Sequence, residues 1–278
     1  MNLRKNLPLY LAAIPVIAAL HAAAAAAGIK TYVYLWELLI DGRTVLLAGL
    51  LYLLLKPAQW RNDAQDRGVF RWSIAKNAGA FLIPVLLTGL IAAAGLLVKK
   101  VQFADPENGT TLALTTLFDI PAIFIFSVTT VFVEEYIFRG WILTEFERSG
   151  SAWMGFFFSS VLWAVYALSD LVPLEDFAWT TLGLMALYYC AVGIAASALY
   201  YGSRSLWVSY SFRIGVMTLT PLMLTGAAES AEAFFSTENP LFFGDGIIAS
   251  AALMLLFGGV FLSVHQRRRR TLEAAVQR

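Results

Sequence analysis

Three charged residues follow a long apolar run at a spacing that could support chemistry. The run ends at Val133, Glu134 and Glu135 come directly after it, and Arg139 follows one helical turn later. On a helix, residues four apart share a face, so Glu135 and Arg139 can form an ion pair. Glu134 is rotated by about 100° from Glu135 and points elsewhere. A carboxylate in such a low-dielectric setting can take a proton from water, which is the action of a general base.

A purely structural arrangement fits the same spacing. Glu135 and Arg139 could form a salt bridge at the end of a helix, with Glu134 as a second carboxylate at the level of the lipid headgroups. Spacing alone leaves both interpretations open, so the elements that carry these residues have to be considered.

The composition of the chain predicts a membrane protein. Of its 278 residues, 59% are hydrophobic and only 14% are charged, and the mean hydropathy is +0.69. Soluble domains carry about 25% charged residues, so a soluble globule, a disordered chain and a nucleic-acid-binding protein all fit poorly. The single Cys190 excludes an internal disulfide and a zinc site made of cysteines, and the chain has only two histidines, His21 and His265.

Apolar runs of about 20 residues, long enough to cross a bilayer, predict about eight transmembrane helices. The second run is the weakest, because Glu37, Asp41 and Arg43 interrupt it. It could begin as an interfacial helix and span the membrane only from about Thr44, which would give seven spans. We therefore expect an all-α fold, a polytopic membrane helix bundle that forms one domain over residues 1–278. The predicted spans are 7–28, 32–55, 73–98, 111–133, 152–172, 177–201, 206–226 and 246–264.

The basic residues predict the orientation in the membrane, because Lys and Arg stay on the cytoplasmic side. With the N-terminus inside and eight spans, 15 of the 20 Lys and Arg residues fall in cytoplasmic segments, whereas the outer loop 227–245 holds no base. We therefore expect a multi-pass protein of the cytoplasmic membrane with both termini in the cytoplasm. The run Arg267–Arg270 is then an anchor beside anionic lipid, and the net charge of +1 indicates no nucleic-acid partner.

Over about residues 112–224 the chain resembles the CPBP family, also called Abi, of CAAX-processing and bacteriocin-processing intramembrane endopeptidases. Glu134-Glu135-x-x-x-Arg139 resembles the first motif of the family. The segment Phe157–Ala164 is similar to the second motif region, and Gly202–Val208 is similar to the approach to the third.

The chain departs from the family pattern at the expected histidines. The second motif of the family is Phe-x-x-x-His, and here Trp163 and Ala167 stand at its two ends. The third motif brings a histidine followed four residues later by an asparagine, and here those positions are Arg213 and Met217. A zinc site needs several converging donors that this chain does not offer, so we expect neither a metal nor a cofactor.

The resemblance implies a glutamate-dependent protease, in which one glutamate activates water and further side chains stabilise the oxyanion. Carried over to this chain, Glu134 is the base and Glu135 with Arg139 is the structural pair. Arg213 and Tyr166 could donate to the developing oxyanion in place of the histidines. Arg213 could equally form a salt bridge to Glu134 and silence it, and the sequence leaves both open.

Three functions remain as hypotheses. The leading one is an intramembrane endopeptidase that cuts a membrane-embedded or lipidated peptide near the cytoplasmic face. The alternative is a catalytically silent relative that binds a membrane protein partner as an immunity, assembly or scaffold factor. The third is a transporter or proton relay built on Asp119, Glu134 and Asp170, although no inverted repeat supports it.

Overall fold

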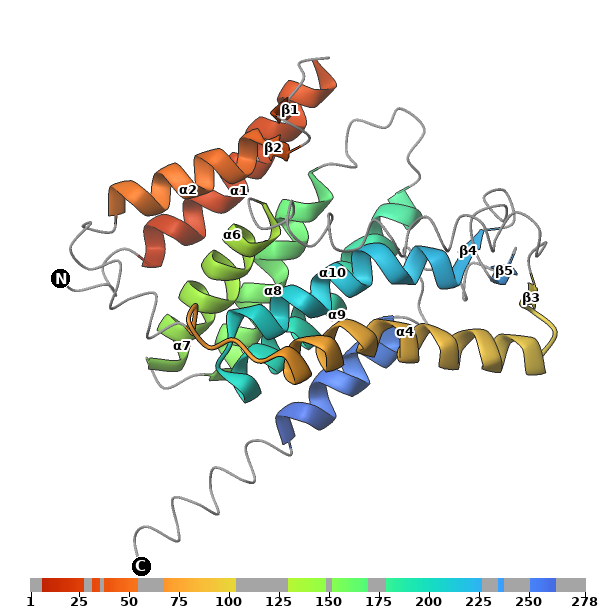
Figure 1. Ribbon diagram of the computed structural model, residues 1–278. Helices are drawn as coiled ribbons and strands as arrows, with labels where there is room; N and C mark the ends of the chain where they lie inside the picture. The colour runs from red at the N-terminus through yellow and green to blue at the C-terminus, as the bar shows by residue number, and fades with distance from the viewer. Residues whose placement is uncertain are drawn as a thin grey trace, which may run out of the picture.

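Helices make up most of the structure, a computed structural model that describes residues 7–27, 32–35, 38–54, 68–103, 130–148, 152–169, 179–226, 235–237 and 251–263. Eight helical runs lie within these residues (Figure 1). They are α1 (Leu7–Ala26), α2 (Gly42–Leu54), α4 (Ile74–Leu97), the continuous run of α6 (Val131–Glu135), η4 (Tyr136–Leu143) and α7 (Thr144–Arg148), α8 (Ala152–Leu168), α9 (Trp179–Ser203), α10 (Leu206–Met223), and a last helix, Ala251–Ser263.

Two small sheets accompany the helices in the described residues. In the first, β1 (Tyr32–Leu35) pairs antiparallel with β2 (Leu38–Asp41), and Tyr32 lies opposite Asp41. In the second, β5 (Phe235–Thr237) lies between β3 (Gln102–Phe103), to which it is antiparallel, and β4 (Leu224–Gly226), to which it is parallel. The fold is therefore helical, with strands confined to short connecting segments.

The second predicted span is wrong in its first ten residues. Residues 32–35 and 38–41 form the antiparallel strands β1 and β2, not an interfacial or spanning helix, and of the described residues in this range only Gly42–Leu54 are helical. The strands are rich in Tyr, Val, Ile and Leu, which favour strands as readily as apolar helices. At 1.5 Å per residue, the 13 residues of α2 reach about 20 Å, short of the roughly 30 Å of a hydrocarbon core.

Most of the other predicted spans coincide with observed helices. α1, α4, α8, α9, α10 and the last helix lie within their predicted ranges to within a few residues. Two described helical segments, Ile74–Leu97 and Leu182–Ser203, are long and apolar enough to cross a membrane. The predicted span 111–133 lies outside the described residues except at its end. There Val131–Val133 lie in α6, the helix that ends with Glu134 and Glu135.

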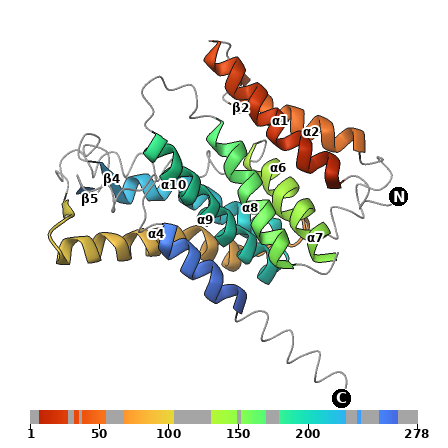
Figure 2. The same ribbon diagram turned by 180° about the vertical axis from the view of Figure 1, so that it is seen from behind.

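The centre of the bundle is formed by η4, α8 and α9, with α10 beside them (Figure 1). α8 and α9 approach closely at Gly193, where an added Cβ atom would lie 2.9 Å from the Ser160 Cβ. α4 packs along α10, and the α1–α2 pair lies on the other side, against α8. Seen from behind, the last helix lies by α9 (Figure 2), where Gly258 contacts Ile194.

An ion pair ties α7 to the connection between α9 and α10. Both terminal nitrogens of Arg204 donate to the carboxylate of Glu147. Burial lowers the pKa of the Arg204 guanidinium, but the Glu147 carboxylate raises it by more, so the net shift is upward. Arg204 therefore stays charged and can hold the Glu147 carboxylate.

Candidate active site

Four charged side chains form a buried cluster where α6, η4 and α10 meet. Arg213 Nη1 donates to Glu134 Oε2 at 2.7 Å and to Glu135 Oε1 at 3.1 Å. Arg139 Nη1 lies 3.2 Å from the same Glu135 oxygen. Only 7% of Glu134 and 6% of Arg213 is exposed, and Glu135 and Arg139 are fully buried. The negative charges of two carboxylates and the positive charges of two guanidinium groups thus compensate one another in a buried position.

The helix that carries three of these residues is unusual in its geometry. Glu134 and Glu135 end α6, and Arg139 lies in η4, which is π-helical over eight residues. The Glu135–Arg139 pair expected from the four-residue spacing is present in spite of the wider turns. π-helical segments are rare and occur often at functional sites, so this distortion marks the cluster as more than a packing feature.

Some polar atoms of the cluster have no hydrogen-bond partner among the described residues. They are Glu135 Oε2 and the Nε and Nη1 of Arg139, whose Nη1 contacts Glu135 outside hydrogen-bond geometry. An unsatisfied buried polar group costs about 1–3 kcal/mol, and more if charged. Replacing such a cluster by apolar residues is often neutral or stabilising, so stability alone does not account for it.

Trp163 on α8 connects three of the four charges. Its indole Nε1–H donates to Glu134 Oε2 at 3.2 Å. The guanidinium carbons of Arg213 and Arg139 lie 4.3 Å and 5.0 Å from its ring centroid, within cation–π range. The sequence placed Trp163 in a motif but gave it no role, because its indole donor meets Glu134 only in the folded chain.

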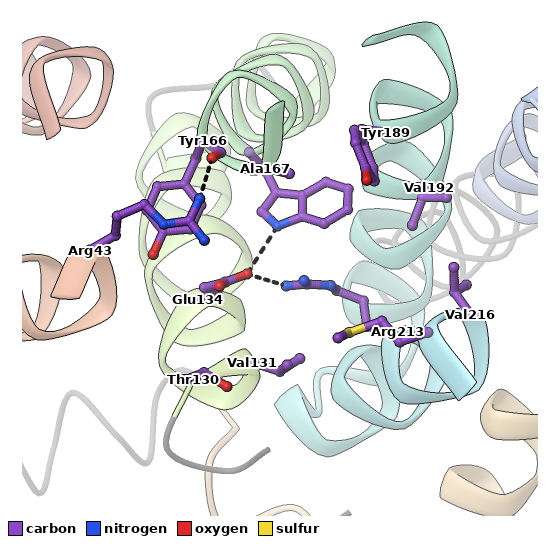
Figure 3. Close-up of a pocket in the computed structure, with 12 residues that line it drawn as sticks. Arg43, Thr130, Val131, Glu134, Tyr166, Ala167, Tyr189, Val192, Arg213 and Val216 are labelled. Carbon is purple, nitrogen blue, oxygen red and sulfur yellow. Dashed lines mark hydrogen bonds and ion pairs between the residues drawn. The ribbon is translucent and has the colours of Figure 1, made fainter. Parts of the chain in front are cut away.

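A cavity of about 260 Å³ lies beside the cluster (Figure 3). It is lined by residues of α2, α6, α8, α9 and α10, and the side chains of Glu134 and Arg213 point toward each other on its wall. The lining residues are Arg43, Thr130, Val131, Glu134, Trp163, Tyr166, Ala167, Tyr189, Val192, Arg213, Val216 and Met217. Its walls are largely apolar, with a charged pair at one place, which is the usual character of a ligand site.

The four positions that depart from the family motifs all line this cavity. Trp163 and Ala167 contribute from α8, and Arg213 and Met217 contribute from α10, one turn apart. The structure therefore brings together the residues that the motif comparison had paired only by sequence. It also leaves open space beside Ala167, where the family pattern has an imidazole.

Tyr166 lines the cavity, and its hydroxyl is directed to α2. It lies 3.2 Å from Thr44 Oγ1. Arg43 on α2 donates from Nη1 to the Tyr166 carbonyl oxygen and to Ser169 Oγ, both at 2.8 Å, and its guanidinium lies 4.5 Å from the Tyr166 ring centroid. The sequence listed Arg43 only as an interruption of a span, and nothing in its spacing indicated a place on the cavity wall.

The remaining polar candidates lie elsewhere. Asp119, Asp170 and His265 are outside the described residues. His21 is buried on α1 and is not among the residues that line the cavity. Within the described part of the chain, no three His, Cys, Asp or Glu side chains gather in a way that could hold a metal ion.

Comparison with known proteins identifies the segment that carries the cluster. Residues 115–219 match a family model described as Rce1-like, type II CAAX prenyl endopeptidase Rce1-like. The match includes Glu134, Trp163, Ala167, Arg213 and Met217 and leaves α1, α2 and α4 outside. No curated protein and no solved structure matches the chain.

Proposed function

We propose that the chain is an intramembrane endopeptidase in which Glu134 activates water, because residues 115–219 match the model of Rce1-like type II CAAX prenyl endopeptidases. The observation that carries this proposal is the pairing of Glu134 with Arg213 on the wall of a largely apolar cavity. A carboxylate and a cation at hydrogen-bond distance are the two groups that water-dependent peptide hydrolysis needs.

Glu134 and Arg213 each have polar atoms that make no hydrogen bond to a described residue. Every hydrogen bond that Glu134 makes with a described residue falls on Oε2, which leaves Oε1 for a water molecule. Every hydrogen bond that Arg213 makes with a described residue comes from Nη1, which leaves Nε and Nη2. A buried guanidinium with spare N–H groups is a suitable donor to an oxyanion, since no water competes for it.

The reaction follows from these atoms. Glu134 Oε1 takes a proton from water while the water oxygen attacks the peptide carbonyl carbon, and the carbonyl electron pair moves onto its oxygen. That oxyanion accepts hydrogen bonds from Arg213. When the tetrahedral intermediate collapses, the C–N bond breaks and the proton on Glu134 passes to the leaving nitrogen. Glu134 returns to its starting state without a metal or cofactor.

The ion pair also limits the rate. Arg213 stabilises the charged carboxylate in the ground state, so part of its attraction has to be given up as Glu134 takes a proton. Removing one oxyanion donor typically lowers the rate 10²- to 10³-fold, and here a histidine is replaced at both motif positions. We therefore expect slow turnover.

The cavity location supports a membrane-associated peptide as substrate. The helices around it are strongly apolar, and α9 includes one of the two described segments long enough to cross a bilayer. We infer that the chain lies in the cytoplasmic membrane with both termini inside, and that the substrate enters from the inner leaflet as a lipidated or transmembrane peptide.

The proposal is tested with purified protein in detergent and two fluorogenic substrates, one lipidated peptide and one transmembrane peptide. We expect slow cleavage by the wild type and a loss of at least about 10²-fold in Glu134→Gln. Glu145→Gln is the matched control, because Glu145 is a buried glutamate paired with Arg148 on α7. Equal turnover by wild type and Glu134→Gln, or no turnover by either, would refute the endopeptidase.

A catalytically silent relative is the second candidate, and the Arg213 bridge favours it. One nitrogen of Arg213 binds both glutamates, so the same contact that positions Glu134 also neutralises it. The chain would then keep the cavity to bind a membrane protein partner.

Restoring the motif separates the two candidates. The triple variant Ala167→His, Arg213→His, Met217→Asn supplies the family's side chains on the same cavity wall. A silent relative predicts no wild-type cleavage and new cleavage in the triple variant. An active enzyme predicts cleavage by the wild type already.

A further inference from the structure

Trp163 contacts the cluster in a way that its neighbours on α8 do not. Its indole N–H donates to Glu134 Oε2, and two guanidinium groups lie over or beside its ring. The ring is buried, with Tyr189 packed edge-on at 5.7 Å between centroids. Packing on these sides fixes the direction in which its single N–H points.

This fixed donor matters because a glutamate carboxylate is not fixed by its own rotamer. The terminal torsion of glutamate is broad and roughly two-fold, so either oxygen can face either way. Arg213 carries several donors and can bind either oxygen. Trp163 has a single donor, on a buried ring packed against Arg139, Arg213 and Tyr189, so it binds one particular oxygen.

The two donors also meet on the same atom. Arg213 Nη1 and Trp163 Nε1 both bind Glu134 Oε2, at 2.7 Å and 3.2 Å. The plane of the carboxylate is then set by two directions, while Oε1 takes part in neither bond, and all three residues line the cavity. Figure 3 shows the Arg213 guanidinium directed at the Glu134 carboxylate.

We propose that Trp163 is the positioning residue of this centre, and that its indole N–H together with Arg213 holds Glu134 with Oε1 facing the cavity. The family pattern has a phenylalanine at this position, which cannot donate, so the role belongs to this chain. The catalytic consequence rests on the proposed function, but the hydrogen bond itself does not.

The hydrogen bond is tested by nuclear magnetic resonance on protein labelled with ¹⁵N-tryptophan in nanodiscs, without substrate. Trp163→Phe assigns the indole signal by its disappearance. In Glu134→Gln we expect that signal to move upfield, since a neutral amide replaces the charged acceptor. Trp207 is the internal control, because its indole N–H donates to the Val69 carbonyl oxygen at 2.6 Å and should not move. An unmoved Trp163 signal would overturn the proposal.

The consequence is tested by kinetics with the substrate that the wild type cleaves best. Trp163→Phe keeps an aromatic ring for the arginines and removes only the donor. We expect kcat to fall about 10- to 100-fold, the range for one hydrogen bond to a charged group, with KM within about 2-fold. Trp207→Phe should change neither. A loss confined to KM, or an equal loss in both variants, contradicts positioning. If the wild type cleaves nothing, the proposed function fails, while the resonance experiment still decides the contact.

Discussion

At the scale of single residues, the cluster is held together by charges that depend on one another. Arg213 bridges both glutamates, and Arg139 approaches Glu135 from its own helix. Removing any one of them leaves a buried charge without compensation. Such a loss is far more costly than the loss of an ion pair at the surface.

This difference is measurable in Arg139→Met. We expect the variant to lose about 3–5 kcal/mol in the free energy of unfolding, because Glu135 is left buried with fewer opposite charges. Lys76→Met is the control, since Lys76 is exposed on α4 and compensates no buried charge among the described residues. Its loss should be about 0–1 kcal/mol. SDS-titration unfolding of both variants checks this, and equal losses would argue against a tightly coupled cluster.

The sequence predicted part of this cluster. A spacing of four residues is a local property of a helix, so Glu135 and Arg139 could be paired without a structure. Arg213 was aligned to the site through a motif, and its contact with Glu134 was one of two alternatives. Trp163 and Arg43 could not be assigned, because their contacts join α8 to α6 and α2 to α8, which no local pattern encodes.

At the scale of elements, the cavity depends on how closely α8 and α9 pack. Gly193 on α9 allows the approach, since a Cβ there would lie 2.9 Å from the Ser160 Cβ and 3.0 Å from its Cα. Two residues that line the cavity lie next to this contact. Trp163 on α8 comes one turn after Ser160, and Val192 on α9 directly precedes Gly193.

Gly193→Ala is therefore expected to push the two helices apart. We expect a destabilisation of about 1–3 kcal/mol from overpacking, measured as thermal unfolding in one detergent. Gly183→Ala on the same helix is matched, because its added Cβ has nothing within 4 Å. That change should be neutral or stabilising by up to about 1 kcal/mol, since alanine favours helix over glycine. A neutral Gly193→Ala would contradict the close contact.

Hydropathy located most helices but misread one described segment. It counts apolar residues without distinguishing a strand from a helix, so strands β1 and β2 were taken for the start of a span. Glu134 lies in the first turn of α6, where a carboxylate interacts favourably with the helix dipole.

At the scale of the whole molecule, the basic residues predict that both termini lie in the cytoplasm. Fusions of green fluorescent protein to either end should therefore fluoresce, and alkaline phosphatase at either end should stay inactive. A phosphatase fused in the acidic loop 227–245 should be active. An active phosphatase at only one terminus would place the two termini on opposite sides of the membrane. The number of spans would then be odd, and the inferred entrance of the cavity from the inner leaflet would have to be revised.

The reach of Arg43 across to Tyr166 and Ser169 has a consequence for how relatives diverge. Through it α2 contributes to the wall of the cavity, although α2 lies outside the segment that matches the Rce1-like model. This part of the wall can therefore vary between relatives while the glutamate–arginine cluster stays the same. For the proposed endopeptidase, we expect chimeras that exchange residues 1–54 to cleave a different set of peptides with the same dependence on Glu134.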